Sequence, residues 1–585
     1  MESILRGETA LTFDWITNNW GLYFISACIY FIVQLLLVVL LNNVYLGAFI
    51  SFILWILAAV VNFYKMEMMG DPVLPWDFLY ANQIFDLLPA LYKNVNLVLL
   101  ISVAVAAVVI IGLLIKFTAF KTFNWKVRIG ALVVLIACMM LVYNFDKNFV
   151  GKSFKSAGAA SIPWNQIESQ EKNGMIVGFL LNVPNIRVEK PANYSAKSMA
   201  ALNDQVEQML MNEEYLTTDE KPNVVMIMSE AYWDLKKIGI PQDGSTLTPT
   251  IDANQIGEIV SPRYGGGTST VEFEALTGFS MAHLPGGAVP YQQFLVNETP
   301  SLARTFKAHG YSTTAIHTYY KYFWNRIQAY EALGFDQFIG LDDLVDPAFF
   351  GWMYVDDQVV TDEIMKTIEE SDKPSFIYAV TMLNHGLYND TRYGDNTMQA
   401  VDEYSDESNQ ILNNLATGYK RSDEAYADLL ERIEASNEPT LVVFFGDHLP
   451  SMNATYEEVG FVESMAKKSL EEELKMKQTP LVVWNNYGQS IEQVGNVSTS
   501  FLPPLVMEWA QLPGIGYYSV LQEMLETMPA YTSIVKETAD GELVKETPSQ
   551  YTELENMYKM IQYDIMFGDK HSASSLFELM DKGLK

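Results

Sequence analysis

Potential metal ligands and acid–base groups come just after four short apolar runs in the part of the chain that follows residue 220. Glu230 follows the first run, His317 and His385 follow the next two, and Asp447 and His448 stand side by side after the fourth. Ligands of open α/β sheets bind beyond the carboxyl ends of the strands. If the four runs are strands of one sheet, these side chains converge on one site.

Glu230, Asp447 and His448 together offer two carboxylates and an imidazole, a set that suits Mn²⁺, Mg²⁺ or Zn²⁺. Taken alone, an Asp-His pair is as often a turn or a helix cap, and a single glutamate is usually part of a surface salt bridge. Their joint occurrence after separate runs favours a metal site.

The candidate nucleophile is Thr268, which follows the glycines Gly265–Gly267. Ser269 and Glu272 have the spacing of a capping box, so a helix is expected to begin here. A helix N-terminus attracts anions, so a phosphate could lie against Thr268. The threonine hydroxyl is a poor nucleophile unless a metal or a base lowers its pKa. The alternative is a glycine loop that only caps a helix.

Aromatic and cationic side chains come together in the segment Tyr322–Arg326. Arg326 can bind a phosphate through two parallel hydrogen bonds, although an arginine packed on an aromatic ring at a helix start is at least as common. His317 is given no role. The remaining histidines are read as structural or surface residues: His283, His309 and His571.

Short apolar runs alternate with helical patterns from about residue 222 onward, which is typical of an α/β domain with a mostly parallel central sheet. The expected strands are Val224–Met228, Thr313–Ile316, Phe376–Thr381, Leu441–Phe445 and Leu481–Trp484. The expected helices are Ser301–His309, Arg326–Leu333, Asp357–Glu370 and approximately Asn409–Ala435. The C-terminal part, 513–585, shows helical patterns and many acidic residues.

Apolar stretches near the N-terminus, 20–41, 45–64, 96–115 and 129–145, reach or approach the roughly 20 residues that cross a bilayer. Buried core helices are the alternative, but so many uncharged runs in the first quarter of the chain favour a transmembrane domain over residues 1–147. Residues 148–220 then form linker helices. Residues 221–512 form the catalytic domain, to which 513–585 belongs.

Basic residues set the expected orientation. The loop between the third and fourth spans carries Lys116, Lys121, Lys126 and Arg128 without an acid, so this loop should be cytoplasmic and the residues after 146 should lie outside the cytoplasm. An even number of spans places the N-terminus outside as well, unless a further span precedes this sequence. The external loop 65–95 is either an interfacial amphipathic segment or an ordinary loop.

Composition agrees with a chain that is split into an apolar and an acidic part. Apolar residues make up 49% of the 585 residues, yet the formal net charge is −32. A strongly acidic surface argues against nucleic acid as a partner, because phosphates would be repelled. The two cysteines, Cys28 and Cys138, lie in apolar runs and support no disulfide framework.

Several short segments of the chain resemble segments of the lipoteichoic acid synthase family, within the alkaline phosphatase and sulfatase superfamily. The matching segments, in the family's order, are Met228–Glu230, Gly267–Phe273, Phe323–Arg326, Asn384–His385 and Gly446–His448. The resemblance extends to the membrane part, since the family has a multi-span N-terminal region and an outward-facing sulfatase-like catalytic domain.

The resemblance implies roles for individual residues. Glu230, Thr268, Asp447 and His448 would bind the metal, most often manganese, and Thr268 would form a covalent glycerophosphate intermediate. Trp324, Arg326 and His385 would contact the glycerophosphate, and His385 could protonate the leaving diacylglycerol. The implied donor is the membrane lipid phosphatidylglycerol. The implied acceptor is a glycolipid or a growing polyglycerolphosphate chain, as in lipoteichoic acid synthesis.

Departures from the family pattern leave the substrates open. Gly267 stands where the family often has a basic residue, and we count four spans where five are common. A phosphoethanolamine transferase or phosphodiesterase of the same fold remains an alternative, as does a non-catalytic polymer-binding protein of the cell envelope. No Cys/Ser-x-Pro-x-Arg motif lies near Thr268, which disfavours sulfate-ester hydrolysis.

Overall fold

The computed structural model describes residues 2–6, 9–69, 72–78, 109–117, 123–160, 162, 166–186, 188–210, 221–242, 244–350, 354–465 and 467–579. The chain forms two compact units, of which the first comprises 1–188 with 285–288 and the second 189–284 with 289–585. The helices of the predicted linker region are divided between them. The first unit holds α8 (Phe149–Ser156), α9 (Gln166–Asn173) and α10 (Met175–Leu181), and the second holds α11 (Ala196–Leu210).

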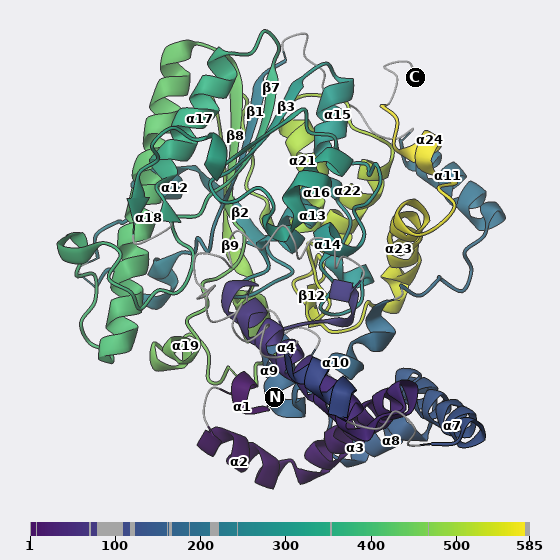
Figure 1. The fold of residues 1–585 in the computed structure, drawn as a ribbon. Helices are drawn as coiled ribbons and strands as arrows, with labels where there is room; N and C mark the ends of the chain where they lie inside the picture. Colours follow the sequence, from purple (N-terminus) through teal and green to yellow (C-terminus); the bar gives the residue numbers. More distant parts are fainter. Residues whose placement is uncertain are drawn as a thin grey trace. The chain divides into compact units, whose positions relative to one another are not determined.

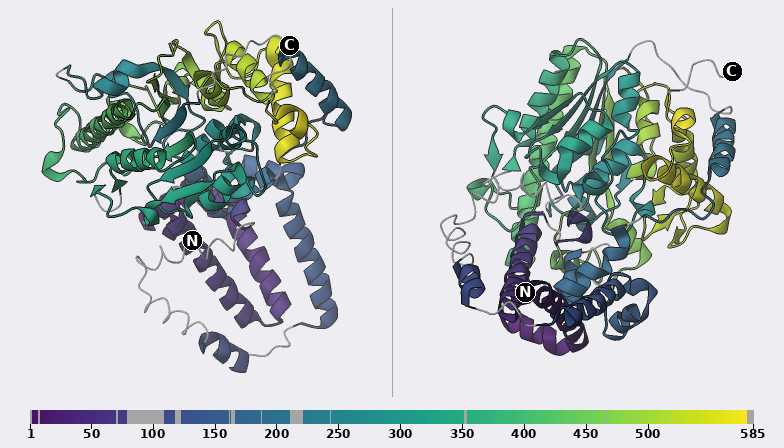
Figure 2. Two further views of the ribbon diagram at one scale, coloured as in Figure 1. Left: turned by 90° about the horizontal axis from the view of Figure 1, so that it is seen from above. Right: turned by 45° about the vertical axis from the view of Figure 1, so that its right-hand side comes forward.

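Among the described residues, three helices of the first unit are long and apolar enough to cross a membrane. They are α3 (Trp20–Leu41), α4 (Val44–Met69, apolar as far as Phe63) and α7 (Trp125–Tyr143). They overlap the predicted spans 20–41, 45–64 and 129–145, with α7 beginning four residues before the predicted start. Most of the predicted span 96–115 lies outside the described residues, although 109–117 is helical. Within the first unit α3 packs against both α4 and α7, and Figure 2 shows the three helices side by side.

The side chains of these three helices explain why they need a membrane. Only 17%, 22% and 6% of the residues in the apolar stretches of α3, α4 and α7 are buried in the protein. A long helix that is apolar all round and is not buried needs a hydrocarbon environment. The chain is therefore anchored in a membrane. The short helices of this unit are α1 (Glu2–Leu5), α2 (Thr9–Asn18), η2 (Phe145–Lys147) and η3 (Val183–Ile186).

The second unit is built on a sheet with the strand order β10-β2-β9-β8-β1-β7-β3-β4. The strands are β1 (Asn223–Ser229), β2 (Gln255–Val260), β3 (Ser312–His317), β4 (Gln337–Gly340), β7 (Ser375–Val380), β8 (Thr440–Gly446), β9 (Gln478–Asn485) and β10 (Gly495–Ser498). Only β9 pairs antiparallel with its neighbours. The other strands of this sheet therefore run in one direction, and their carboxyl ends share one edge.

Helices cover both faces of this sheet (Figure 1). One face carries α12 (Pro249–Asn254), α17 (Asp357–Glu369) and α18 (Asp406–Ser436), and the other carries α13 (Thr268–Thr277), α15 (Leu302–Ala308), α21 (Leu502–Trp509) and α22 (Tyr517–Thr527). Apolar residues of α17, α18 and β1 form one core cluster. The other α-helices described in this unit, besides α11, are α14 (Pro290–Gln293), α16 (Arg326–Leu333), α19 (Ala454–Glu458), α20 (Leu470–Lys475), α23 (Thr552–Met566) and α24 (Ala573–Leu576).

The structure confirms the predicted α/β class and mostly parallel sheet. Every predicted strand and helix of this unit is present, with ends that shift by a few residues. The sequence pattern does not reveal β2, β4 and β10, because these strands mix polar residues or glycine with apolar ones. The C-terminal part is not purely helical, since it also contains a small antiparallel sheet of two-residue strands: β11 (Ala530–Tyr531), β12 (Lys536–Glu537) and β13 (Leu543–Val544).

The pairing of β1 with β8 fixes where their following residues emerge. Ser229 is the register partner of Gly446, so Glu230 and Asp447 leave the sheet side by side. A Cβ atom added at Gly446 would lie 2.1 Å from the carbonyl oxygen of Tyr232. The close approach of β8 to the turn after β1 therefore requires glycine at this position.

Replacing Gly446 by alanine should lower the free energy of unfolding by roughly 1–3 kcal/mol, because the neighbouring group is backbone and cannot rotate away. Denaturant unfolding of the detergent-solubilised chain measures this change. Gly130→Ala is the matched control, since a Cβ atom there meets no described atom within 4 Å. Equal destabilisation by both substitutions would contradict the close approach.

Candidate functional site

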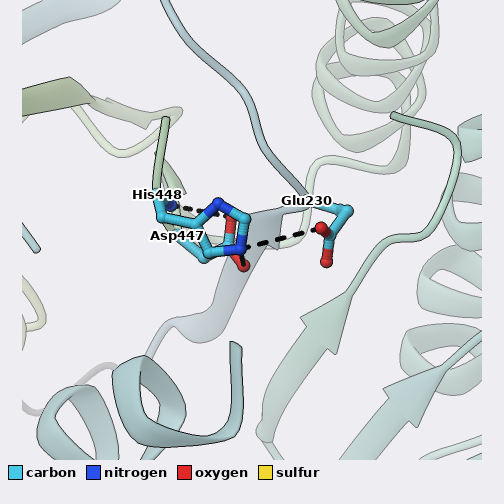
Figure 3. A group of neighbouring side chains, drawn as sticks. All are labelled: Glu230, Asp447 and His448. Carbon is cyan, nitrogen blue, oxygen red and sulfur yellow. Dashed lines mark hydrogen bonds and ion pairs between the residues drawn. The ribbon is translucent and has the colours of Figure 1, made fainter. Parts of the chain in front are cut away.

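The three predicted metal ligands meet beyond the carboxyl ends of β1 and β8 (Figure 3). Nε2 of His448 lies 3.8 Å from Oε1 of Glu230 and 3.2 Å from Oδ2 of Asp447. Each of the three residues is at most 4% exposed. One ligand atom of each lies within 4.8 Å of the other two, so the cluster is buried and already assembled.

Hydrogen bonds around the cluster orient its ligand atoms. Nδ1 of His448 donates to the carbonyl oxygen of Leu449 at 2.9 Å, which leaves a lone pair on Nε2. Oδ1 of Asp447 accepts from the backbone N–H groups of Ala231 and His448, both at 2.8 Å. Oδ2 of Asp447 and Nε2 of His448 are buried and have no hydrogen-bond partner among the described residues. Both atoms therefore remain available to a ligand.

The cluster holds negative charge without a cation of its own. Neither Glu230 nor Asp447 forms a salt bridge with a lysine or arginine in the part of the chain that the structure describes. Burial, and then the charge of Asp447, raise the pKa of Glu230 to about 8. Lone pairs that point at one buried place repel each other unless a proton or a cation lies between them. Carboxylate oxygens with an imidazole nitrogen fit Mn²⁺, Mg²⁺ or Zn²⁺.

Thr268 lies against this cluster. It is the first residue of α13, and the preceding Gly267 has a φ of 90°, a conformation that favours glycine. The hydroxyl of Thr268 donates to Oε2 of Glu230 at 3.2 Å, and the residue is 8% exposed. The candidate nucleophile therefore stands beside the metal ligands at a helix N-terminus, where free N–H groups favour an anion.

The predicted capping box of Ser269 and Glu272 is wrong, although a helix does begin here. The cap of α13 is Gly267, and Oγ of Ser269 has no partner among the described residues. Glu272 turns inward instead, where its Oε2 accepts from the hydroxyl of Tyr330 at 2.6 Å and its Oε1 from Nη2 of Arg326 at 2.5 Å. A buried carboxylate needs such a charged partner.

Arg326 is 1% exposed, and the carboxylate of Glu272 is the group that its guanidinium binds through two nitrogens. Burial alone would lower the pKa of Arg326, but Glu272 raises it, so the guanidinium stays charged. The pair ties α16 to α13. The neighbouring Trp324 is 8% exposed and has a left-handed backbone with a φ of 57°. Direct contacts of Arg326 or Trp324 with a substrate stay predictions.

His385 follows β7, which is the neighbour of β1 in the sheet. Its Nδ1 donates to the carbonyl oxygen of Gly386 at 2.7 Å, which leaves Nε2 as the available nitrogen. The imidazole stacks on the ring of Tyr354 with a centroid separation of 6.0 Å. Burial lowers the pKa of His385, while the charge of Asp447 acts in the opposite direction. His385 therefore feels the charge of the metal-ligand cluster.

Two residues that the sequence pattern does not point to hold the His385 loop in place. The hydroxyl of Tyr354 donates to the carbonyl oxygen of Gly386 at 2.6 Å. The guanidinium of Arg392 lies 4.2 Å above the ring of Tyr354 and donates to backbone carbonyl groups of the loop. These acceptors are the carbonyl oxygens of Leu383, His385 and Leu387.

His317, which the sequence analysis leaves without a role, ends β3 beside β7. Its Nδ1 donates to the carbonyl oxygen of Val380 at 3.1 Å, and its buried Nε2 has no hydrogen-bond partner among the described residues. Burial, and then the charge of Arg326, hold the pKa of His317 well below its usual value. The only sign in the sequence that His317 lies at this edge of the sheet is its position directly after a predicted strand. His283, by contrast, bonds to Gln562 and Tyr531 away from this cluster.

Known proteins are similar to this chain in sequence or in fold. Residues 222–512 match the family described as Sulfatase. A protein of Rhizobium meliloti (strain 1021), whose name links it to cyclic beta-1,2-glucan modification, is 30% identical over 579 residues, which cover 96% of this chain and 89% of that protein. Lipoteichoic acid synthase 1 of Bacillus subtilis (strain 168) is 24% identical over 260 residues, which cover 40% of this chain and 38% of that protein.

A solved structure on the same fold is the Streptococcus pyogenes phosphoglycerol transferase GacH in complex with sn-glycerol-1-phosphate. It aligns with a TM-score of 0.56 and 21% sequence identity, covering 67% of this chain and 100% of that chain. This likeness is one of fold.

Addition of Mn²⁺ at about 100 times its Kd should raise the free energy of unfolding by about 2.7 kcal/mol. Asp447→Asn should remove most of this gain, because it deletes a charged ligand. Denaturant unfolding after chelation, with and without added Mn²⁺, measures the difference. Asp395→Asn replaces an exposed acid and should keep the gain. A full gain in Asp447→Asn would contradict the proposed ligand set.

Proposed function

The chain belongs to the sulfatase family, and from that premise we propose that it is a membrane-anchored glycerophosphotransferase with Thr268 as its nucleophile. The observation that carries the proposal is the hydroxyl of Thr268, 3.2 Å from Glu230 in a cluster that fits a divalent cation. The phosphoglycerol transferase GacH, which binds sn-glycerol-1-phosphate on the same fold, supports glycerol phosphate as the transferred group.

Glu230, Asp447, His448 and Thr268 would hold the cation, which we propose is Mn²⁺. When bound, the cation lowers the pKa of a neighbouring hydroxyl and offsets charge on phosphoryl oxygens. Every other proposed contribution comes from side chains of this protein.

In the first step, Oγ of Thr268 attacks the phosphorus of phosphatidylglycerol. The new Oγ–P bond forms as the bond between phosphorus and the diacylglycerol oxygen breaks. The proton of Thr268 passes to Oε2 of Glu230, which already accepts its hydrogen bond. Nε2 of His385 gives a proton to the leaving oxygen, and because burial lowers the pKa of His385, its protonated form is a stronger acid.

In the second step, an acceptor hydroxyl attacks the same phosphorus and the Oγ–P bond breaks. His385 takes the proton of the acceptor hydroxyl, and Thr268 recovers its proton from Glu230. The product is a phosphodiester, and the enzyme returns to its starting state. Since both steps use the same groups in reverse order, one site serves donor and acceptor.

We propose that the acceptor is a saccharide or glycolipid hydroxyl outside the cytoplasm, where the basic loop before α7 would direct the catalytic unit of a multi-pass protein. The Rhizobium meliloti relative matches nearly the whole chain, and its name supports a glucan. Polyglycerolphosphate, the acceptor in lipoteichoic acid synthesis, has less support, because the lipoteichoic acid synthase matches only 40% of this chain.

Thr268→Ala should reduce release of diacylglycerol from labelled phosphatidylglycerol by at least about 10³-fold, because it removes the attacking oxygen. It should also abolish label fixed on the protein. Thr268→Ser is the control, since it keeps a hydroxyl and should retain both signals in part. Phosphatidylethanolamine, tested in parallel, identifies the headgroup. Undiminished lipid turnover by Thr268→Ala would remove the proposed nucleophile.

His385→Gln should slow turnover of phosphatidylglycerol by about 10²-fold, because the diacylglycerol oxygen leaves poorly without a proton. A nitrophenyl ester of glycerol phosphate needs no such proton, so its turnover should fall much less. Tyr354→Phe keeps the stacked ring but loses the hydrogen bond to the loop, and should show the same substrate dependence more weakly. Equal losses on the two substrates would contradict an acid role for His385.

A further inference from the structure

The loop between β3 and α16 presents a row of aromatic side chains that the proposed chemistry does not use. We call Tyr319, Tyr320, Tyr322 and Phe323 the tyrosine shelf. Each of these residues is half-buried. The ring centroids of Tyr320 and Tyr322 lie 5.4 Å apart, and the two rings are nearly parallel, at 14°. The ring centroid of Tyr319 lies 5.1 Å from those of Tyr320 and Phe323. The four side chains therefore form one contiguous, half-buried aromatic cluster.

The shelf lies at the carboxyl edge of the sheet, where β3 ends at His317. The ring of Tyr319 lies 6.2 Å from that of His317, which ends β3 next to β7. At the other end of the shelf, the ring of Phe323 lies 5.5 Å from that of Trp324. A molecule on this surface would therefore lie at the same edge of the sheet as Thr268 and the metal-ligand cluster.

The shelf is apolar on its ring faces and polar at its edge. The hydroxyl groups of Tyr319, Tyr320 and Tyr322 have no hydrogen-bond partner among the described residues, whereas the hydroxyl of Tyr354 is bonded. A tyrosine offers a flat apolar ring together with a polar tip. That combination matches a sugar ring, which has a C–H face and hydroxyl groups around its edge. A hydrocarbon chain would leave the hydroxyl groups unpaired.

Charge selects the kind of saccharide. Lys321 is the one cation within the shelf sequence, and its ammonium group is paired with Asp343 and lies 5.6 Å from the ring of Phe338. It is therefore not available to an acceptor phosphate. The chain also has a net charge of −32, which repels a polyanion. A neutral saccharide meets neither obstacle.

We propose that the tyrosine shelf binds the sugar rings of a neutral saccharide acceptor and directs one of its hydroxyl groups to the phosphoryl-transfer site. This inference rests on the proposed function and names its acceptor class. The shelf serves the second half of the reaction. It is not needed when Thr268 reacts with the lipid donor.

The test separates the two half-reactions in the full-length detergent-solubilised chain with Mn²⁺ and labelled phosphatidylglycerol. Release of diacylglycerol and label on the protein report the first half, and label transferred to a neutral β-glucan oligosaccharide reports the second. In the double variant Tyr320→Ala/Tyr322→Ala, the first half should be unchanged and the KM for the oligosaccharide should rise about tenfold or more. Tyr551→Ala, a half-buried tyrosine of the C-terminal region, is the matched control.

Two further measurements test saccharide binding and folding directly, without any need for turnover. Saturation-transfer NMR with the oligosaccharide alone should detect binding to the wild-type chain and to Tyr551→Ala, and lose it in the double variant. Thermal unfolding shows whether the double variant is folded; if it is not, Tyr320→Phe/Tyr322→Phe, which keeps the rings and removes the hydroxyl groups, should still weaken binding.

An unchanged KM and unchanged binding in folded variants would overturn the shelf as an acceptor site. A loss of the first half-reaction would assign the shelf to the lipid donor and overturn it equally. Polyglycerolphosphate should not compete with the oligosaccharide, and competition would contradict the preference for a neutral acceptor. Absence of any protein label in the wild type would defeat the proposed function alone, because oligosaccharide binding is measured separately.

Discussion

The site depends on the electrostatic repulsion between ligand atoms that the sheet holds close together. Because β1 and β8 are paired with Ser229 opposite Gly446, two carboxylates and an imidazole lone pair are held together away from water. No lysine or arginine among the described residues is paired with them. Burial and the charge of Asp447 raise the pKa of Glu230, so a bound proton is favoured there. A divalent cation would offset the repulsion between these groups more strongly. The fold therefore maintains a place that a cation completes.

Side chains next to this place are held by partners of their own. Glu272 and Arg326 bind each other, which joins α13 to α16 and leaves the start of α13 facing Glu230 with Thr268. The loop of His385 is held by uncharged contacts to Tyr354 and by carbonyl groups bound to Arg392. Within the cluster itself, Oδ2 of Asp447 and Nε2 of His448 have no hydrogen-bond partner among the described residues, so these two atoms remain available to a ligand.

Much of this arrangement follows from sequence, for a physical reason. Parallel strands share an edge for their carboxyl ends, so ligand-type residues after separate apolar runs, such as Glu230 and Asp447, must lie near one another. The spacing of residues along the chain predicts a local hydrogen bond wrongly where a residue distant in sequence binds the same side chain instead. Ser269 and Glu272 fit a capping box, yet Glu272 bonds to Arg326, 54 residues away. The supports Tyr354 and Arg392 carry no local pattern at all, and the two-residue strands after residue 529 are too short to show a period.

The central claim is that one cation is bound by Glu230, Asp447, His448 and the hydroxyl oxygen of Thr268. Anomalous scattering from crystals of the protein grown with Mn²⁺ tests it most directly. The account predicts a single strong peak at about 2.0–2.2 Å from one atom of each of these four residues. A peak at another place, or ordered side chains at this cluster with no peak between them, would contradict it.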